Sequence, residues 1–270
     1  MTSDTYLLGT EPLELERLRL QHELWLPEAR RAWRRADLAP GERVLDLGAG
    51  PGFVALELAR EVGPAGRVLG LELSASYVEA ARALGRGLSQ LEVRCLDLSN
   101  DPLPVEPFDL VWCRWVLMFL PEVEPLLDRL AASLSPGARL VIHEYIHWSS
   151  FGLHPHGEAV GRFGAAAMAS FQRAGGDTDV NRRLPSLLTA RGFRVDELLP
   201  LTMVGRLGDG VARWLERFVT IYGRELIRCG QWSEDDGRRA EAEMATARQD
   251  PGSFWVGPTL METRATRWAT

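Results

Sequence analysis

The feature that most constrains the fold is the stretch 44–52, VLDLGAGPG, in which an apolar segment runs into a glycine-rich turn. The segment 44–47 has the composition of a buried strand, and Gly48, Gly50 and Gly52 follow it. Glycine has no Cβ and tolerates positive φ, so a ligand can approach the backbone of such a turn closely. A helix predicted over 53–62 would present unpaired N–H groups to the polar atoms of that ligand. The pattern indicates a nucleotide-type site in an α/β sheet.

Carboxylates end the next apolar segments. Glu72 ends the segment 67–72, where a carboxylate is well placed to accept two ribose hydroxyls. The segment 91–96 leads to Asp97, which is placed to take the exocyclic amine of an adenine or, alternatively, to cap the following turn. The segment 108–113 leads to Arg114.

Five elements in this order resemble the class I S-adenosylmethionine-dependent methyltransferases. They are VLDLGAGPG at 44–52, LGLE at 69–72, LDLSNDPLP at 96–104, FDLVWCRWVLMFLPE at 108–122 and LSPGARLVIHEY at 134–145. The subgroup they most resemble contains the small-molecule enzymes related to the ubiquinone and menaquinone C-methyltransferases. The resemblance covers about residues 40–145. It implies a doubly wound α/β sheet of seven mostly parallel strands, S-adenosylmethionine as cofactor and S-adenosylhomocysteine as product.

The resemblance also implies which residues bind the cofactor. Arg114 either contacts it through the backbone or is a surface arginine, and Tyr77 either packs near the adenine or fills the core. Gln21 lies on an N-terminal helix, about 11–36, which in related enzymes closes over the cofactor. The expected cofactor-binding residues are Gln21, Asp46, Gly48, Ala49, Gly50, Gly52, Glu72, Leu73, Tyr77, Asp97, Leu98 and Arg114.

The segment 143–148, HEYIHW, is the candidate for the reacting end because it leaves the carboxyl end of the fifth predicted strand. Tyr145 or His147 is expected to orient the methyl acceptor, and His147 has the chemistry of a base near neutral pH. The alternative is that these side chains only hydrogen-bond the surrounding lid. Trp115 and Trp148, which follow the fourth and fifth strands, are expected to line an apolar substrate pocket. Spacing indicates no metal site.

Alternating strands and helices divide the chain into a core and insertions. Helices are expected at about 75–87, 122–134 and 179–191, the sixth strand at 193–204 and the last at 254–263. Connections that leave the carboxyl edge of a parallel sheet lie on its ligand side, so the insertions should form a lid. The predicted units are an N-terminal helical lid segment 1–40, a binding core 41–146, a lid insertion 147–178, a core helix and strand 179–204, a helical lid insertion 205–253, and the last strand and C-terminus 254–270.

Composition limits the partners. Of 270 residues, 31 are basic, all of them arginine, and 37 are acidic, so the net charge is −6. The chain therefore lacks the excess of positive charge that is typical of nucleic-acid-binding proteins. The sequence carries no signal-peptide pattern and no apolar run of membrane-spanning length. We therefore expect a cytoplasmic monomer or homodimer that acts on a small molecule, without nucleic-acid or membrane partners.

The predicted activity is methyl transfer to a small, apolar or aromatic molecule by in-line displacement. A nicotinamide-dependent oxidoreductase is the first rival, but its fingerprint is G-x-G-x-x-G rather than the G-x-G-x-G present here. The second rival is a non-catalytic protein of the same fold that binds the cofactor or a partner. The intact glycine and acidic positions favour cofactor binding. Methyl transfer requires no particular catalytic side chain, so the sequence does not distinguish an enzyme from a protein that only binds the cofactor.

Overall fold

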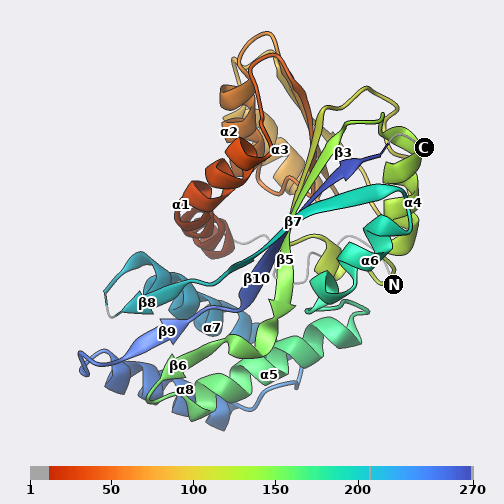
Figure 1. The fold of residues 1–270 in the computed structure, drawn as a ribbon. Helices are drawn as coiled ribbons and strands as arrows, with labels where there is room; N and C mark the ends of the chain where they lie inside the picture. The colour runs from red at the N-terminus through yellow and green to blue at the C-terminus, as the bar shows by residue number, and fades with distance from the viewer. Residues whose placement is uncertain (1–11, 207, 269–270) are drawn as a thin grey trace.

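The computed structural model describes residues 12–206 and 208–268 and is built on a seven-stranded sheet of order β3-β2-β1-β4-β5-β10-β7 (Figure 1). The first five strands of that order pair in parallel, and β10 is antiparallel to both β5 and β7. This confirms the predicted doubly wound, mostly parallel sheet. The strands are β1 Arg43–Leu47, β2 Arg67–Glu72, β3 Leu91–Cys95, β4 Leu110–Arg114, β5 Arg139–His147, β7 Phe193–Leu201 and β10 Thr259–Arg267.

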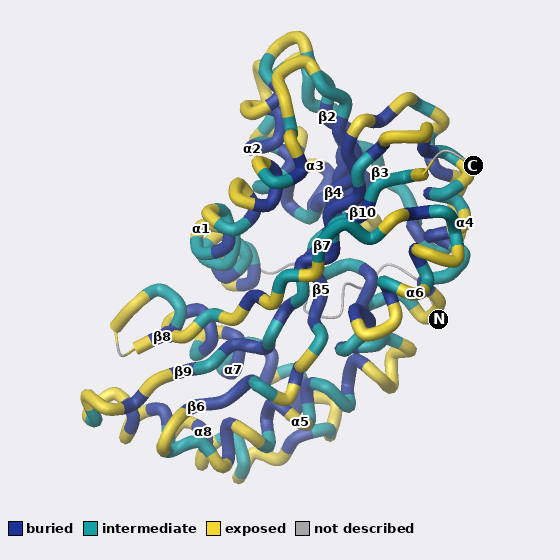
Figure 2. The backbone as a smooth tube through the Cα atoms, in the orientation of Figure 1, coloured by how far each residue is buried: buried dark blue, intermediate teal, exposed yellow. Residues whose placement is uncertain are grey.

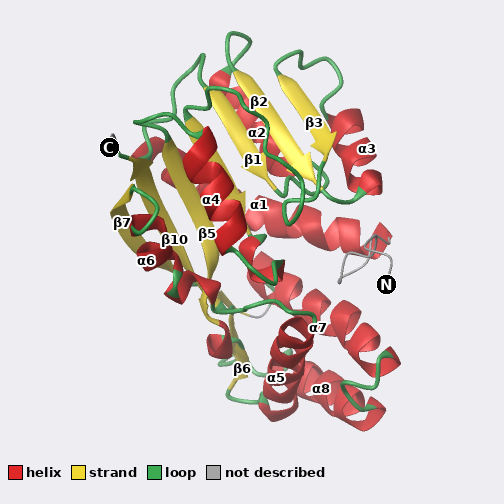
Figure 3. Ribbon diagram, turned by 90° about the vertical axis from the view of Figure 1, so that its right-hand side faces the viewer, coloured by secondary structure: helices red, strands yellow, loops and turns green. Residues whose placement is uncertain are grey.

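Helices cover both faces of this sheet (Figure 3). On one face lie α1 Pro12–Arg35, α2 Phe53–Val62 and α3 Ala75–Leu84, and on the other lie α4 Glu124–Ser133 and α6 Leu184–Thr189. The central strands are therefore buried on both sides, as the dark tubes of β2 and β4 show in Figure 2. This explains why their sequences are apolar throughout instead of alternating.

A second layer lies beyond the carboxyl ends of the parallel strands. It contains a small sheet of order β6-β9-β8 and three helices (Figure 1). We call this layer, residues 148–173 and 204–256, the lid. Its strands are β6 Gly152–His154, β8 Val204–Arg206 and β9 Phe254–Val256, and its helices are α5 Glu158–Arg173, α7 Gly210–Arg228 and α8 Glu234–Ala247. Short 3-10 turns occur at η1 Leu117–Phe119, η2 Trp148–Ser150 and η3 Val180–Arg182. Of these turns only η2 lies in the lid.

The structure corrects three predicted elements. The strand expected at 254–263 is two strands in different sheets, β9 and β10, because Gly257 and Pro258 interrupt it. The strand expected at 193–204 likewise ends at Leu201, and the chain resumes as β8 in the lid. The helix expected at 179–191 is a 3-10 turn followed by the six-residue α6. A hydrogen bond from the Gly257 N–H to the Met203 carbonyl, at 2.9 Å, joins the first two interruptions.

The N-terminal helix connects the core to the lid. Trp33 and three alanines near its C-terminal end are buried on α2 and the sheet, and its N-terminal half packs against α7. There the side-chain oxygen of Gln21 accepts hydrogen bonds from Arg17 at 2.7 Å and from the Trp214 indole at 3.0 Å. In the ranges 12–206 and 208–268, no helix is long and apolar enough to cross a membrane.

Candidate active site

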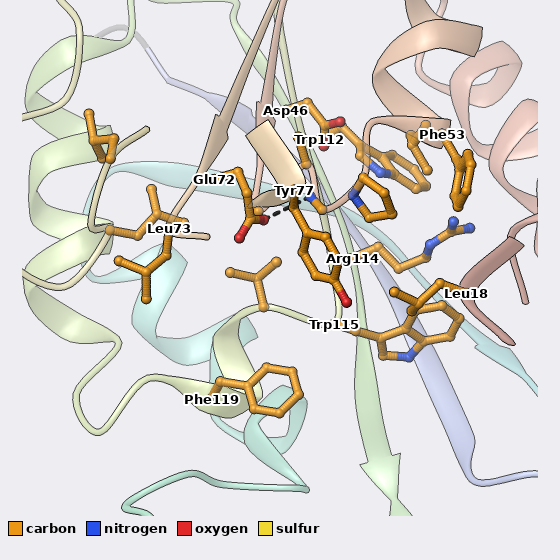
Figure 4. A pocket seen from close by; sticks show the side chains of 18 of the residues that line it. Leu18, Asp46, Phe53, Glu72, Leu73, Tyr77, Trp112, Arg114, Trp115 and Phe119 are labelled. Atoms are coloured by element: carbon orange, nitrogen blue, oxygen red, sulfur yellow. Dashed lines mark hydrogen bonds between the residues drawn. The ribbon is translucent and has the colours of Figure 1, made fainter. Parts of the chain in front are cut away.

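A cavity of about 320 Å³ lies at the carboxyl edge of the sheet, between the ends of β1, β2, β3 and β4 and the helix α1. Figure 4 shows Tyr77 projecting between Glu72 on one side and Arg114 and Trp115 on the other. The residues that line the cavity are Leu18, Gln21, His22, Asp46, Gly48, Ala49, Gly50, Pro51, Phe53, Val54, Glu72, Leu73, Tyr77, Leu96, Asp97, Leu98, Ser99, Trp112, Arg114, Trp115, Val116, Phe119 and Leu120.

The glycine turn forms the floor of this cavity. Gly48, Gly50 and Gly52 all have positive φ, at 66°, 54° and 86°. A Cβ at Gly50 would meet no atom within 4 Å, whereas a Cβ at Gly48 would lie 2.3 Å from Cγ2 of Val116. The turn is thus open to a ligand at Gly50 and tightly packed at Gly48.

Glu72 fixes the turn from the end of β2. Its carboxylate accepts the backbone N–H of Gly50 and that of Ser74, each at 2.8 Å. Burial raises the pKa of Glu72, and these backbone hydrogen bonds act in the opposite direction. The carboxylate keeps lone pairs for further donors, such as a pair of ribose hydroxyls.

Polar groups without partners lie at the opposite end of the cavity. Oδ2 of Asp46 and Nη1 of Arg114 are buried and have no hydrogen-bond partner among the described residues. Burial, countered by the charge of Arg114, raises the pKa of Asp46 to about 8. Burial also lowers the pKa of Arg114 to about 10. Such groups are costly unless a ligand pairs with them.

His22 belongs to the same end of the cavity. Burial, and then the charges of Arg114 and Arg30, lower its pKa to about 4, so the imidazole is neutral at pH 7. Its Nδ1 is buried and has no partner within the described part of the chain. His22 therefore offers one more hydrogen-bonding nitrogen beside the carboxylate and the guanidinium.

At the β3 end, Asp97 caps the following turn and also lines the cavity. Its Oδ1 accepts the Ser99 N–H at 2.8 Å and its Oδ2 accepts the Asn100 side-chain amide at 2.8 Å, while the residue lines the cavity. Burial alone would raise the pKa of Asp97, but these hydrogen bonds outweigh it and hold the pKa below the usual value.

The structure brings most of the expected cofactor residues together. Eleven of the twelve line the cavity: Gln21, Asp46, Gly48, Ala49, Gly50, Glu72, Leu73, Tyr77, Asp97, Leu98 and Arg114. Trp115 lines it as well. The twelfth, Gly52, caps α2, and a Cβ there would lie 2.5 Å from the Ala81 Cβ, so its role is close packing between helices.

Three residues expected at the reacting end lie outside the cavity lining. Trp148 is buried in the lid, where its indole N–H donates to the Gly164 carbonyl at 3.0 Å. Tyr145 lies between Trp148 and Trp115, at ring-centroid distances of 4.9 and 6.1 Å. His147 is exposed, with Nε2 3.3 Å from the Ser149 hydroxyl. Trp148 does not line this cavity, because the chain turns through η2 immediately after β5.

Sequence reasoning missed three parts of the lining. Leu18 lies one helical turn before both Gln21 and His22, a spacing that could have identified this face of α1. Trp112 and Arg114 share one face of β4 by alternation, and register pairs Trp112 with Asp46. Phe119 ends the short 3-10 turn η1 and Leu120 follows it, and so short a turn has no sequence periodicity.

Comparisons with known proteins agree with this geometry. Residues 44–137 match the model of the methyltransferase domain family. Over 124 residues the chain is 35% identical to an aklanonic acid methyltransferase of Streptomyces sp. (strain C5), covering 45% of this chain and 56% of that protein. It is 33% identical to a demethylmenaquinone methyltransferase of Lactococcus lactis, covering 47% and 50%. The chain thus spans about half the length of these curated relatives.

The fold is shared with a geranyl diphosphate C-methyltransferase from Streptomyces coelicolor A3(2), solved with S-adenosylhomocysteine. The TM-score is 0.58 at 16% identity, with 91% of this chain and 78% of that chain covered. Strand order, glycine turn and carboxylates therefore define a Rossmann-like nucleotide-cofactor protein. Residues 44–137 belong to the methyltransferase domain family, and the chain is similar to class I S-adenosylmethionine-dependent methyltransferases that act on small molecules.

The residues fit the cofactor of that family. Its methionine part carries an ammonium and a carboxylate, and Asp46 and Arg114 present an acceptor and a donor without partners at one end of the cavity. Glu72 and Asp97 offer carboxylate oxygens at the other end, and no atom lies near the Cβ position of Gly50 between them. Within residues 12–206 and 208–268, no group of three His, Cys, Asp or Glu side chains is placed to hold a metal ion.

Proposed function

We propose that this protein transfers a methyl group from S-adenosylmethionine to a small, apolar or aromatic acceptor. The observation that carries the proposal is the cavity itself, with the unpaired Oδ2 of Asp46 and Nη1 of Arg114 at one end and Glu72 with Asp97 at the other. The order of these charges along the sheet edge matches the order of polar groups in the cofactor. Bound S-adenosylmethionine supplies a methyl group on a positively charged sulfur.

The chain contributes binding and alignment. Glu72 accepts the ribose hydroxyls, and Asp97 accepts the adenine amine between the apolar side chains of Leu73 and Leu98. Asp46 accepts from the ammonium, and Arg114 with the neutral His22 donates to the carboxylate. Gly48, Ala49 and Gly50 allow close approach of the backbone. Positioning of this kind can supply about 7–11 kcal/mol of a displacement barrier.

The acceptor side is apolar. Leu18, Trp115, Phe119 and Leu120 line the cavity there, and a planar or aliphatic acceptor would displace little ordered water from them. Tyr145 and His147 are not assigned a contact with the acceptor, because neither lines the cavity. An acceptor that needs deprotonation would have to bring its own acidity or use solvent.

We also propose a small-molecule partner in preference to nucleic acid, because the net charge is −6. A cytoplasmic monomer or homodimer remains the proposed form of the protein. Sedimentation of the purified chain with and without S-adenosylhomocysteine tests the oligomeric state.

Calorimetric titration with S-adenosylmethionine and S-adenosylhomocysteine tests cofactor binding, with reduced nicotinamide dinucleotide as the control. A screen with methyl-labelled donor and a panel of aromatic and apolar acceptors then tests transfer. Micromolar binding of the sulfur ligands alone, followed by label in one acceptor, is the expected result. Binding of the nicotinamide instead would overturn the assignment, and tight cofactor binding with no labelled product across the panel would favour a non-catalytic binder.

A further inference from the structure

Glu144 is a buried carboxyl side chain on β5 that the proposed function does not use. Its side chain has no exposed surface, and its Oε1 accepts two backbone N–H groups, from Val116 at 2.6 Å and from Leu117 at 2.7 Å. Both donors belong to the turn that follows β4. One oxygen atom therefore holds two consecutive peptides of a neighbouring strand connection.

That turn is strained. Trp115 has φ +55°, a left-handed conformation that costs roughly 1–2 kcal/mol for a residue with a Cβ. Its own N–H donates to the His143 carbonyl at 3.1 Å. Strained residues persist where the surroundings over-determine them, and they gather at functional sites. Here the surroundings are the Glu144 carboxylate and the β5 backbone.

The strained turn builds one wall of the cavity. Arg114, Trp115 and Val116 all line it, and the guanidinium of Arg114 lies 4.9 Å from the Trp115 ring centroid. Val116 fills the space beside Gly48 where a Cβ would stand, so the same turn also supports the glycine turn. Displacement of residues 115 and 116 would disturb both sides of the cofactor cavity.

Glu144 is itself held in place from behind. Its backbone carbonyl accepts the Asn181 side-chain amide at 3.1 Å, and the same amide reaches the Met261 carbonyl at 2.6 Å. The Thr263 hydroxyl donates to the side-chain oxygen Oδ1 of Asn181 at 2.7 Å. The support therefore extends from β10 through Asn181 to β5 and then, through the Glu144 side chain, to the cavity wall.

We propose that Glu144 is a positioning residue that fixes Trp115 and Val116 as the cavity wall by accepting both N–H groups of the turn. The inference rests on the proposed function only where it concerns cofactor affinity. Burial raises the pKa of Glu144 to about 8, so the side chain is largely the neutral acid at pH 7. Glutamine, which is neutral and keeps the accepting oxygen, is therefore its conservative replacement.

The test compares Glu144→Gln with Glu144→Met, each alone and combined with Trp115→Phe. Acrylamide quenching and near-ultraviolet circular dichroism, taken as the difference from the matching Trp115→Phe protein, isolate the Trp115 signal without any ligand. Titration with S-adenosylhomocysteine gives the affinity. Far-ultraviolet circular dichroism and the unfolding temperature check that each variant is folded.

We expect Glu144→Gln to keep the Trp115 signal and to bind within about twofold of the parent. Glu144→Met should expose Trp115 to quencher and weaken binding by about tenfold, the effect of one or two lost hydrogen bonds. A folded Glu144→Met protein with the parental Trp115 signal overturns the proposal, and so does a glutamine variant as impaired as the methionine one.

If Glu144→Met does not fold, Glu144→Asp takes its place, because the shorter side chain cannot reach both N–H groups. It should then change the Trp115 signal, and an unchanged signal would count against Glu144 as the positioning residue. If the parent itself fails to bind S-adenosylhomocysteine, the proposed function fails, but the ligand-free Trp115 signal still tests the role of Glu144.

Discussion

The carboxylate of Glu72 accepts the backbone N–H of Gly50 at 2.8 Å, so the end of β2 is joined directly to the glycine turn (Figure 4). Glu72 therefore has two tasks in the proposed site. It orders the turn before any ligand arrives, and its remaining lone pairs face the cavity. Removing it should affect affinity through both.

We predict that Glu72→Ala weakens S-adenosylhomocysteine binding by about 100-fold. A hydrogen bond to a charged group contributes about 1.5–3 kcal/mol, and the ordered turn is lost as well. Calorimetric titration measures the effect. Glu79→Ala, which removes an exposed carboxylate of α3, is the matched control and should bind like the parent. Equal affinity of the two variants would remove Glu72 from the site.

Gly50→Ala and Gly87→Ala form a second matched pair. Both glycines have positive φ, and a Cβ at either position would meet no atom within 4 Å. Each substitution should cost about 1 kcal/mol in the free energy of unfolding, measured with urea. Only Gly50→Ala should weaken cofactor binding, because its Cβ enters the cavity. Parental affinity in Gly50→Ala would contradict the placement of the turn.

Asp46 should couple cofactor binding to proton release. With a pKa of about 8 the buried carboxyl is protonated at pH 6.5 in the free protein. A neighbouring ammonium favours the carboxylate, so binding of S-adenosylhomocysteine should release up to about one proton. Titrations at pH 6.5 in two buffers of different ionisation enthalpy measure that number. Asp46→Asn should bind more weakly and lose this contribution to proton release, and undiminished release would exclude Asp46 as its source.

The same group should make the free protein less stable as pH rises. Between its unfolded pKa of about 3.8 and its folded pKa of about 8, the native state holds a proton that the unfolded state has lost. Stability contributed by the neutral form is therefore complete below about pH 4 and lost as pH rises to about 8. When the free energy of unfolding is measured with urea across this pH range, it should fall less steeply with pH in Asp46→Asn than in the parent. Glu144, whose pKa is also raised to about 8, accounts for part of what remains.

Arg114→Met should reduce the selectivity for ligands that carry an amino-acid group. S-adenosylhomocysteine and 5′-methylthioadenosine share the adenosine and the sulfur, but only the first has the carboxylate that Arg114 would bind. We expect the ratio of their affinities to fall by roughly 10- to 100-fold, the effect of one charge-assisted hydrogen bond. The exposed Arg86→Met is the control. An unchanged ratio of affinities would show that Arg114 does not bind the carboxylate of the ligand.

Trp214→Phe should loosen the contact between α1 and α7. The indole N–H donates to Gln21 at 3.0 Å, and its loss should cost about 1 kcal/mol in the free energy of unfolding. Hydrogen exchange should rise in the N-terminal half of α1. Trp268→Phe, at an exposed indole, serves as control. If α1 exchanges as slowly as in the parent, Gln21 is not its anchor.

The part of the site that sequence could predict is local. A strand, a glycine turn and a helix follow one another within twenty residues, and Glu72 ends the next strand, so their geometry needs no knowledge of distant contacts. The position of His22 depends on how α1 lies over the sheet. That placement results from packing between segments far apart in the chain.

The small sheet of the lid was beyond prediction for a different reason. Its strands have three residues each, too few for alternation of apolar side chains to be recognised. A position just after β5 does not reveal that the chain turns away at once, so the sequence could not place the Trp148 side chain. Burial of its indole against Phe171 and Phe218 is determined by α5 and α7.

Each strand of the lid continues a strand of the main sheet. β5 leads through residues 148–151 to β6, β7 leads through 202–203 to β8, and β9 leads through 257–258 to β10. These three short connections lie at one level across the molecule, two of them joined by the Gly257 and Met203 hydrogen bond. The chain crosses between lid and core a fourth time, from α5 to η3. The small sheet is therefore continuous in the backbone with the large one at all three of its strands, and it is an extension of that sheet rather than a separate unit.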